Sequence, residues 1–189
     1  MKALIVFATI LFSTHSFAGY ILSYALDYHS QADGGDAEEF SMARTNHHIF
    51  IGTTLDRREK LFAGLNINSW NKAQKKGESD EEKTINMLEM GAKFLYYMTK
   101  ERRFFVSYVY NLSVKGKSEE AGVSSDTDGS SSLISFGYHL KLGNPKFLLG
   151  ASLNIHSLTI TSRVADSTES EISDTYSSTF PMLEFVARF

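Results

Sequence analysis

The sequence predicts an all-β protein that forms an eight-stranded, antiparallel, up-and-down β-barrel. Three observations support this prediction. Apolar and polar residues alternate along eight separate segments, which is typical of strands with one apolar and one polar face. The connections between these segments alternate between short turns and longer polar stretches. Only two prolines occur among many serine, threonine and aromatic residues, and this composition favours strands over helices.

The first four predicted strands each place bulky apolar side chains on one face. Their ranges and apolar faces are 20–30 (Tyr20, Leu22, Tyr24, Leu26, Tyr28), 40–56 (Ile49, Ile51, Thr53, Leu55), 61–70 (Ala63, Leu65, Ile67) and 85–98 (Leu88, Met90, Ala92, Phe94, Tyr96, Met98). The opposite faces carry many small and polar residues, such as Gly64 and Asn66. Each segment therefore has the two-residue period of a strand that separates two environments.

The last four predicted strands repeat this pattern. Their ranges and apolar faces are 104–113 (Phe104, Val106, Tyr108, Tyr110, Leu112), 132–142 (Ile134, Phe136, Tyr138, Leu140, Leu142), 147–160 (Phe147, Leu149, Ala151, Leu153, Ile155) and 180–189 (Leu183, Phe185, Ala187, Phe189). The eighth strand ends on the aromatic residue Phe189. Because a chain terminus normally frays, a strong strand former at this position indicates a strand that is used to its end.

The connections predict which end of the barrel faces which compartment. Short turns are expected at 57–60, 99–103 and 143–146, and longer loops at 31–39, 71–83, 114–131 and 161–177. Outer-membrane barrels have short periplasmic turns and longer extracellular loops. With an even number of strands, both termini are expected on the periplasmic side.

The composition of the two faces distinguishes a transmembrane barrel from a soluble one. The interior of an eight-stranded barrel is just wide enough for side chains to fill it, so the bulky apolar set would overfill it. The polar face carries fewer lysines and glutamates than a solvated exterior would. Aromatic residues gather near the short turns, as in the girdle of a membrane barrel; they are Tyr20, Tyr96, Phe104, Phe147 and Phe189. A transmembrane barrel is therefore predicted, and a soluble barrel or sandwich is the alternative.

The N-terminal segment has the pattern of a secretory signal peptide. Lys2 precedes an apolar run, and small residues Ser16 and Ala18 mark a cleavage site. The run is shorter than the roughly 20 residues that span a bilayer. We expect residues 1–18 to be removed and residues 19–189 to form one barrel domain. The absence of cysteine excludes disulfides, thiolate sites and a lipoprotein anchor.

With its strand count, loop asymmetry and terminal Phe189, the chain resembles the small eight-stranded outer-membrane proteins of the OmpX and OmpA-barrel kind. This resemblance implies a location in the outer membrane of a Gram-negative bacterium. It also implies that Leu183, Phe185 and Phe189 form the signal read by the barrel-assembly machinery. The implied partners are outer-membrane lipids and lipopolysaccharide, the assembly machinery, periplasmic chaperones during biogenesis, and an extracellular partner at the loops.

Charged residues on the polar faces predict a network inside the barrel. The alternation points seven side chains inward: Asp27, Glu89, Lys93, His139, Lys141, Glu184 and Arg188. Glu89 and Lys93 share one strand face, as do Glu184 and Arg188. One interpretation is a set of ion pairs that plugs the lumen, because buried charges need partners; the other is a polar relay or gated pore. The narrow interior of eight strands favours the plug.

No catalytic, cofactor or metal site is predicted. The lipid A 3-O-deacylase family uses a His-x-Ser pair, which none of the mature histidines forms, and His156 and Ser157 point to opposite faces as strand neighbours. A palmitoyltransferase-like cluster of His29, Ser30, Asp33 and Asp36 has the ordinary composition of a polar loop. The adjacent histidines 47 and 48 diverge on a strand and offer too few ligands for a metal.

The expected function is therefore structural or interaction-based at the cell surface, performed by a monomeric barrel without enzymatic activity. The net charge of −3 argues against nucleic-acid binding. Two alternatives stay open: a carrier of small apolar molecules across the outer membrane, and a lipid A-modifying enzyme.

Overall fold

The structure is a computed structural model that describes residues 19–33, 40–76, 82–120, 123–165 and 168–189. The predicted signal peptide lies outside the described residues. Eight strands follow one another along the chain: β1 (Tyr20–Asp33), β2 (Phe40–Thr54), β3 (Leu61–Lys76), β4 (Glu82–Tyr97), β5 (Phe104–Glu120), β6 (Val123–Leu142), β7 (Asn144–Ala165) and β8 (Thr168–Arg188).

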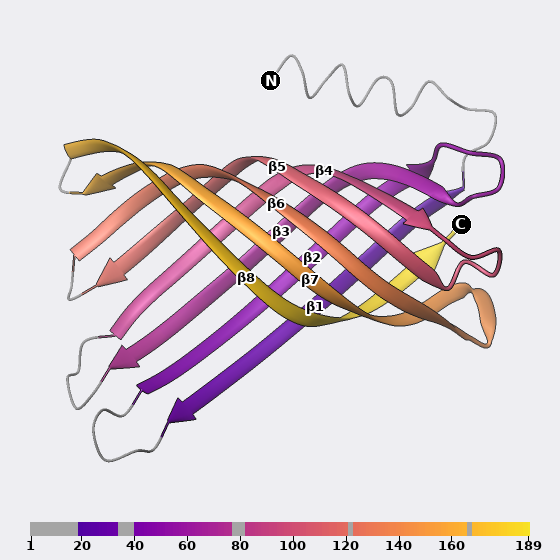
Figure 1. Cartoon of the computed structure of the whole chain (residues 1–189), viewed down its shortest axis with the longest axis horizontal. Helices are drawn as coiled ribbons and strands as arrows, with labels where there is room; N and C mark the ends of the chain where they lie inside the picture. The colour runs from indigo at the N-terminus through magenta and orange to yellow at the C-terminus, as the bar shows by residue number, and fades with distance from the viewer. Residues whose placement is uncertain (1–18, 34–39, 77–81, 121–122, 166–167) are drawn as a thin grey trace.

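The strands form a closed antiparallel barrel in sequence order, in which β8 returns to pair with β1. Figure 1 shows the tilted strands wrapping around one axis, with the start of β1 and the end of β8 together at the end of the short turns. Tyr20 and Phe189 exchange two backbone hydrogen bonds of 2.9 Å there. The predicted fold class, an eight-stranded up-and-down barrel, is confirmed.

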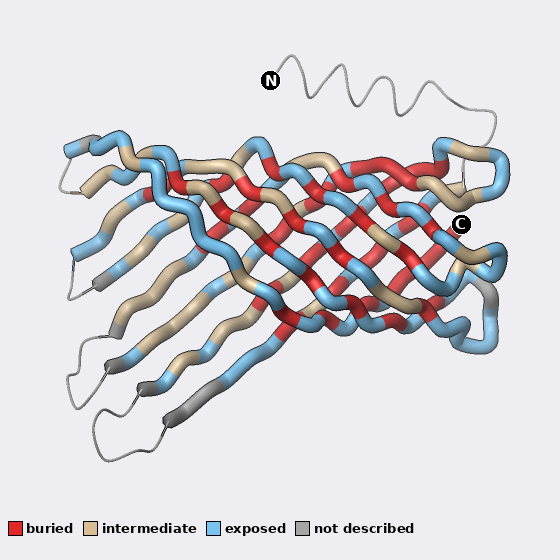
Figure 2. Tube along the Cα trace, viewed as in Figure 1, coloured by how far each residue is buried: buried red, intermediate tan, exposed pale blue. Residues whose placement is uncertain are grey.

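The strands turn their apolar faces outward and bury the opposite faces. Buried and exposed residues alternate along the barrel body in Figure 2, as the two-residue period of a strand requires. On β2, for example, Ile49 and Ile51 are exposed whereas His48 and Phe50 are buried. The predicted aromatic girdle is exposed as well, at Tyr20, Tyr96, Phe104, Phe147 and Phe189.

The strands extend beyond the ranges predicted from sequence. Most of the predicted loops 71–83, 114–131 and 161–177 lie in strands, because β3, β5 and β7 continue outward and β6 and β8 begin early. The alternation of apolar residues could not predict these extensions because their cross-strand pairs are polar. The Ser118 and Ser125 hydroxyls lie 2.8 Å apart, and Lys117 pairs with Asp126 at 3.7 Å. Such pairs stabilise a hairpin without an apolar face.

The seam between β1 and β8 is paired over only part of its length. The register joins Ile21–Leu26 to Leu183–Arg188 and ends there. By contrast, the pairing of β1 with β2 extends over all of β1, from Tyr20 to Asp33. Figure 1 shows β1 and β8 diverging toward the end that carries the long hairpins. The barrel is therefore closed at the short-turn end and parted along one seam toward the other end.

Small interior residues make room for large ones. A Cβ atom at Gly150 would collide with the ring of His139, and one at Gly137 would collide with the ring of Phe105. Both glycines lie on strands next to these rings. Inside the barrel, a glycine on one strand thus leaves the space that an aromatic ring on the neighbouring strand occupies.

The turn between β2 and β3 is held by one carboxylate. Asp56 Oδ1 accepts hydrogen bonds from the backbone N–H groups of Lys60 (2.7 Å) and Leu61 (2.8 Å). Burial of the carboxyl group alone would raise the pKa of Asp56, but these two N–H groups and the Thr54 hydroxyl outweigh it and hold the pKa below its usual value of 3.8.

The Asp56→Asn substitution should lower the free energy of unfolding by about 1 kcal/mol at pH 7, because the turn loses hydrogen bonds to a charged acceptor. A group with a depressed folded-state pKa stabilises the protein above its unfolded pKa and loses that contribution as the pH falls through the folded value. The difference between the variant and the wild type should therefore shrink below pH 3.8. Urea unfolding of the detergent-solubilised barrel at pH 7 and pH 3 measures this, with the exposed Asp174→Asn as control. A pH-independent difference would contradict the assignment.

Cysteine pairs test the parted seam, because the chain has no cysteine of its own. Tyr24→Cys with Phe185→Cys joins two residues in register, with a Cα separation of about 5.5 Å that a disulfide can bridge. Ser30→Cys with Thr179→Cys continues the same register past its end. Oxidation should cross-link the first pair and leave the second free, as seen by mobility on a non-reducing gel. Equal cross-linking of both pairs would mean that the seam is closed.

Candidate functional site

The interior of the barrel is layered from the short-turn end to the long-hairpin end. The first layer is an apolar cluster of buried side chains: Ile21, Phe50, Phe62, Leu95, Tyr97, Phe105, Leu148 and Val186. Two polar clusters, around Glu184 and Glu89, come next, and a cavity opens beyond them. This apolar layer departs from the expected plug of polar and charged side chains. Large rings fit inside because glycines on neighbouring strands lie beside them. The sequence pattern of a single strand does not show which residues lie beside it on the next strand.

The Glu184 cluster links four side chains from β4, β6 and β8. Glu184 Oε2 lies 3.2 Å from His139 Nε2, and Glu184 Oε1 lies 4.0 Å from the ammonium of Lys93. The other ring nitrogen of His139, Nδ1, lies 2.9 Å from the Tyr97 hydroxyl. Phe105 stacks on the His139 ring at 4.4 Å between centroids. All of these side chains are buried, and His139 and Tyr97 contact Phe105 of the apolar layer.

The Glu89 cluster surrounds one fully buried carboxylate. Trp70 Nε1 donates to Oε1 at 2.8 Å. Donors to Oε2 come from Asn68 at 3.0 Å, Asn111 at 2.9 Å and Ser131 at 2.8 Å, and His156 Nε2 lies 3.2 Å from the same oxygen. These partners belong to β3, β5, β6 and β7. Hydrogen bonds to a charged acceptor are among the strong ones, so Glu89 on β4 ties together the strands from β3 to β7.

A third ion pair lies at the start of the parted seam. Arg44 of β2 donates to Asp27 Oδ2 through Nη2 at 2.7 Å and through Nε at 3.1 Å. The Arg44 guanidinium also lies 4.6 Å from the ring centroid of Phe180 on β8. Arg44 therefore spans from β1 to β8 at the point where their backbone pairing ends.

Six of the seven side chains predicted to point inward are buried: Asp27, Glu89, Lys93, His139, Glu184 and Arg188. Lys141 is exposed, contrary to the prediction. It is two residues from His139 and so belongs to the same face of β6. However, it lies one residue before the end of β6, next to a shift in the β6–β7 register. At the rim of a barrel, a long lysine side chain reaches water.

The ionic partners differ from those that residue spacing suggests. Glu89 and Lys93 share a face, but they are four residues apart on one strand, which is about 13 Å. The contacts run across the barrel, from Lys93 to Glu184 and from His156 to Glu89. Arg188 does not bond Glu184; its guanidinium lies 5.1 Å from the ring of Tyr97, and its Nε and Nη1 have no hydrogen-bond partner among the described residues.

Several members of these clusters are not among the residues predicted from the sequence: Arg44, Asn68, Trp70, Asn111, Ser131 and His156. Alternation does place Asn68, Asn111 and His156 on inward faces. Only the register between strands, however, brings them to one carboxylate. Trp70 lies on the same predicted face as Asn68, at the end of the predicted strand, but alternation alone gives no partner for it.

The described residues contain no group of three or more metal-ligating side chains. His47 lies outside the barrel, where its ring bonds the Tyr24 hydroxyl at 2.7 Å, whereas His48 is buried inside. His29 is exposed, and Asp36 of the loop cluster lies outside the described residues. In the part of the chain that is described, no helix is both long and apolar enough to cross a membrane.

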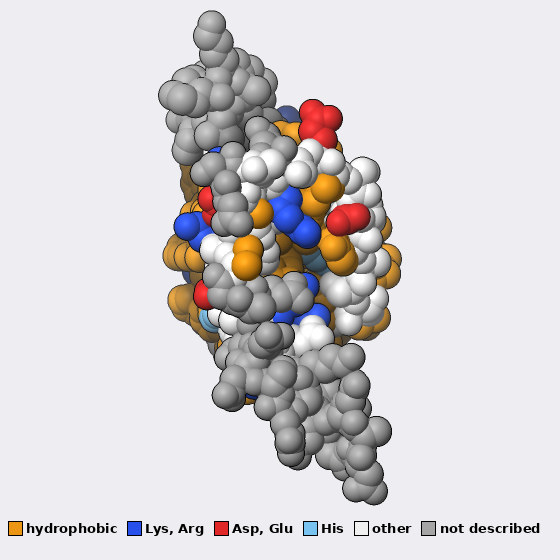
Figure 3. Space-filling view, turned by 90° about the vertical axis from the view of Figure 1, so that its left-hand side faces the viewer, with side chains coloured by type: hydrophobic (Ala, Val, Ile, Leu, Met, Phe, Trp, Pro, Cys, Tyr) orange, Lys and Arg blue, Asp and Glu red, His pale blue; other side chains and the backbone are white. Residues whose placement is uncertain are grey.

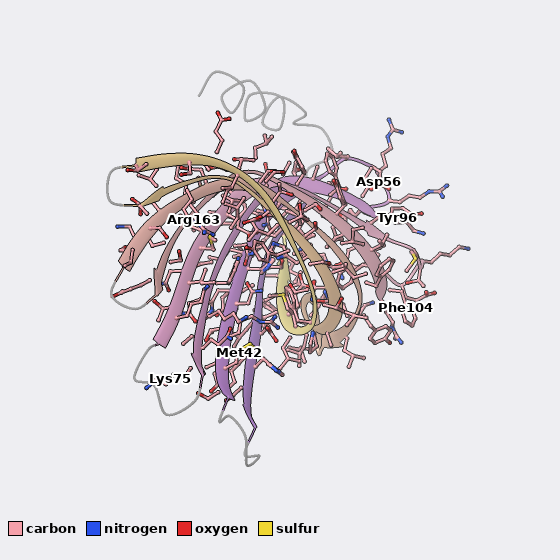
Figure 4. The ribbon with its side chains drawn as sticks, turned by 60° about the vertical axis from the view of Figure 1, so that its left-hand side comes forward. Met42, Asp56, Lys75, Tyr96, Phe104 and Arg163 are labelled. Carbon is pink, nitrogen blue, oxygen red and sulfur yellow. The ribbon has the colours of Figure 1, made fainter. Side chains whose placement is uncertain are left out.

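A cavity of about 950 Å³ opens at the long-hairpin end. Its lining includes Met42, Arg44, Trp70, Lys72, Lys83, Ile85, Met87, His156, Leu158, Ile160, Arg163 and Phe180; we call this cavity the cup. Figure 4 shows Met42 and Arg163 toward this end, far from Asp56, Tyr96 and Phe104 at the short turns. Figure 3 looks into this end, where Lys and Arg side chains gather near the centre beside apolar ones.

The comparisons with known proteins support the fold. No protein-family model and no curated protein sequence matches the chain. Among solved structures, the chain is similar to Neisserial surface protein A (NspA), with 12% identity, a TM-score of 0.50, and coverage of 90% of this chain and 97% of that one. At this identity the likeness concerns the fold alone.

Two autotransporter structures match this chain with lower TM-scores than NspA does. The translocator domain of NalP from Neisseria meningitidis has 9% identity and a TM-score of 0.45, with coverage of 98% of this chain and 66% of that chain. The β domain of the Bordetella autotransporter BrkA has 8% identity and a TM-score of 0.46, with coverage of 90% and 98%. The chain therefore spans about two thirds of the NalP domain.

The Glu89→Gln substitution should destabilise the barrel by about 3 kcal/mol, because several buried donors would share a single neutral acceptor oxygen. Urea unfolding in detergent measures the loss. The exposed Glu171→Gln is the matched control and should change the free energy of unfolding by less than about 0.5 kcal/mol. If both variants unfold like the wild type, the Glu89 cluster does not hold the strands together.

Proposed function

We propose that the protein is an integral outer-membrane β-barrel with a sealed lumen and a structural or surface-interaction role. The observation that carries the proposal is a closed ring of eight strands that exposes large apolar side chains and buries charged ones. In lipid every backbone polar group must be paired within the protein, and the ring achieves this wherever its strands pair, which at the β1–β8 seam means up to Leu26 and Leu183. The outward-facing aromatic and aliphatic residues, such as Phe94, Tyr108 and Leu153, supply the apolar band that such a barrel needs.

The sealed lumen is supported by the two layers nearest the short turns. Phe50, Phe62, Leu95 and Tyr97 are almost completely buried there. His139 and Glu184 lie buried directly above them. A solute would have to displace a packed apolar layer and a hydrogen-bonded polar one. On this basis the barrel anchors and displays its hairpins and does not conduct.

The orientation follows the usual asymmetry of outer-membrane barrels. The short turns and both strand termini would face the periplasm, and the long hairpins would face outside. Leu183, Phe185 and Phe189 are exposed on the last strand, which suits recognition by the barrel-assembly machinery with periplasmic chaperones. At the outer rim, exposed pairs such as Lys115 with Asp128 could meet lipopolysaccharide or an extracellular partner. The proposed role is not enzymatic.

A carrier of small molecules is the second candidate, and the cup at the long-hairpin end favours it. The sealed layers below the cup argue against passage along the barrel axis. A carrier would have to release its cargo between β1 and β8, whose backbone pairing ends at Leu26 and Leu183. A lipid A-modifying enzyme has no comparable support from the described residues.

The full chain expressed in a Gram-negative host should fractionate with the outer membrane. Its migration on a gel should change with boiling, as expected for a stable barrel. In planar bilayers the purified protein should give no steady conductance, because packed side chains fill the lumen. Bilayer recordings at both polarities measure this directly.

Recovery in the soluble periplasmic fraction would contradict the membrane location. A steady ohmic conductance in the wild type would contradict the sealed lumen alone, and would leave the membrane location standing. An unchanged mass of lipid A in cells with and without the protein is expected; a changed acyl content would restore the enzyme hypothesis.

A further inference from the structure

We propose that the cup binds a small amphipathic anion, a carboxylate or sulfonate that carries a short apolar chain. Lys72 and Arg163 would hold the anionic group, and the apolar wall below them would hold the chain. This inference goes beyond the structural role proposed above. It does not depend on any conductance through the barrel.

The charged side chains that line the cup are all of one sign. Arg44, Lys72, Lys83 and Arg163 contribute to the lining, and no aspartate or glutamate is among its described residues. A concave surface with one sign of charge and low-dielectric walls concentrates ligands of the opposite sign. The cup therefore selects anions over neutral or cationic molecules.

Two of these cations are available to a ligand. Arg44 is already paired with Asp27, and Lys83 has contacts of its own. Lys72 and Arg163 form no ion pair or hydrogen bond with another described side chain. They lie on β3 and β7, which are separated by three strands in either direction around the ring. Both line the same cavity, so they approach a ligand from opposite walls.

Apolar side chains form much of the wall beside and below the cations. Met87, Leu158 and Ile160 are buried in one cluster, and Trp70 and Ile85 pack against it. Trp70 is two residues farther from the mouth than Lys72 on β3, which is about 7 Å deeper. The cup thus presents cations near its mouth and apolar surface below, an order that fits an amphiphile entering chain first. A simple inorganic anion would leave the apolar wall unused, and a neutral chain would leave the cations unused.

A chain with an anionic group could come from water or from a membrane lipid. The cup opens at the long-hairpin end, where the amphiphile would enter from the aqueous phase. The backbone pairing of β1 with β8 ends at Leu26 and Leu183, so an acyl chain of a neighbouring lipid that inserts between these strands is the other source. The open mouth and the cations placed near it favour the dissolved amphiphile, and the experiment separates the two sources.

Trp70 reports directly on the site because it is the only tryptophan of the chain and it lines the cup. The folded barrel in phosphatidylcholine nanodiscs is titrated with 8-bromooctanoate, whose bromine quenches an indole on contact. Quenching of Trp70 should saturate. The neutral 8-bromooctanol should bind about tenfold more weakly, and sodium bromide should not quench, because neither offers both an anionic group and a chain.

The double variant Lys72→Gln/Arg163→Gln should weaken bromooctanoate binding about tenfold or more and leave bromooctanol binding unchanged. The matched control, Lys115→Gln/Lys117→Gln, removes two lysines that do not line the cup and should bind bromooctanoate like the wild type. A boiling-dependent shift in gel mobility verifies that each variant is folded.

Three results would overturn the proposal. The first is equal quenching by the acid and the alcohol. The second is quenching that does not saturate or that ignores the Lys72 and Arg163 substitutions, which would indicate partitioning into the bilayer. The third is quenching by brominated phospholipid nanodiscs without quenching by bromooctanoate, which would assign the cup to lipid chains. None of these results bears on whether the lumen conducts ions. The proposal of a sealed lumen is tested separately, by the bilayer recordings.

Discussion

The structure depends on a constraint at its centre: below the cup, the eight strands enclose charged side chains that are almost completely buried. Each buried charge must therefore find its partners on other strands. Glu89 illustrates this, because its carboxylate is bonded by side chains from β3, β5, β6 and β7. A one-residue slip of any of these strands would turn its partner to the outside. The carboxylate therefore helps to set the register of the ring as well as its stability.

The order of the interior layers connects the fold to the proposed roles. Apolar rings fill the short-turn end. The Glu184 and Glu89 clusters share the middle with a second apolar cluster that includes Val109, Leu133 and Met182, and the cup occupies the end where β1 and β8 part. Among these interior layers, the cup combines space, charge and access. Packing and ion pairing below it make the barrel rigid, and a rigid support is what a binding surface at one end requires. The proposed closure of the lumen and the proposed binding in the cup thus rest on the same order of layers.

The direction in which a side chain points can be predicted from its own strand, whereas its partners on other strands cannot. The order of the strands, the outward faces and the inward direction of Glu89, Lys93 and Glu184 follow from alternation along single strands. The partners of these residues do not, because Lys93 meets Glu184 only through the register of β4 and β8 around the ring. The inward rings of Phe50 and Phe105 were not predicted to form an apolar layer either, since the glycines that admit such rings lie on neighbouring strands. Beyond Trp70 and Ser113 the sequence predicts loops where the structure has hairpins. The strand pairing there relies on polar cross-strand pairs, which do not produce an alternation of apolar residues.

The assignment of the two faces supports every other conclusion, and an accessibility scan along β5 tests it most directly. Single cysteines are introduced in turn from Phe104 to Leu112, spin-labelled, and examined in phospholipid bilayers with oxygen and with a water-soluble nickel complex. The account predicts that oxygen accessibility alternates with a period of two, with maxima at the outward positions such as Tyr108 and Tyr110 and minima at inward positions such as Ser107 and Val109. Maxima at the inward positions, or high accessibility of all positions to the nickel complex, would contradict it.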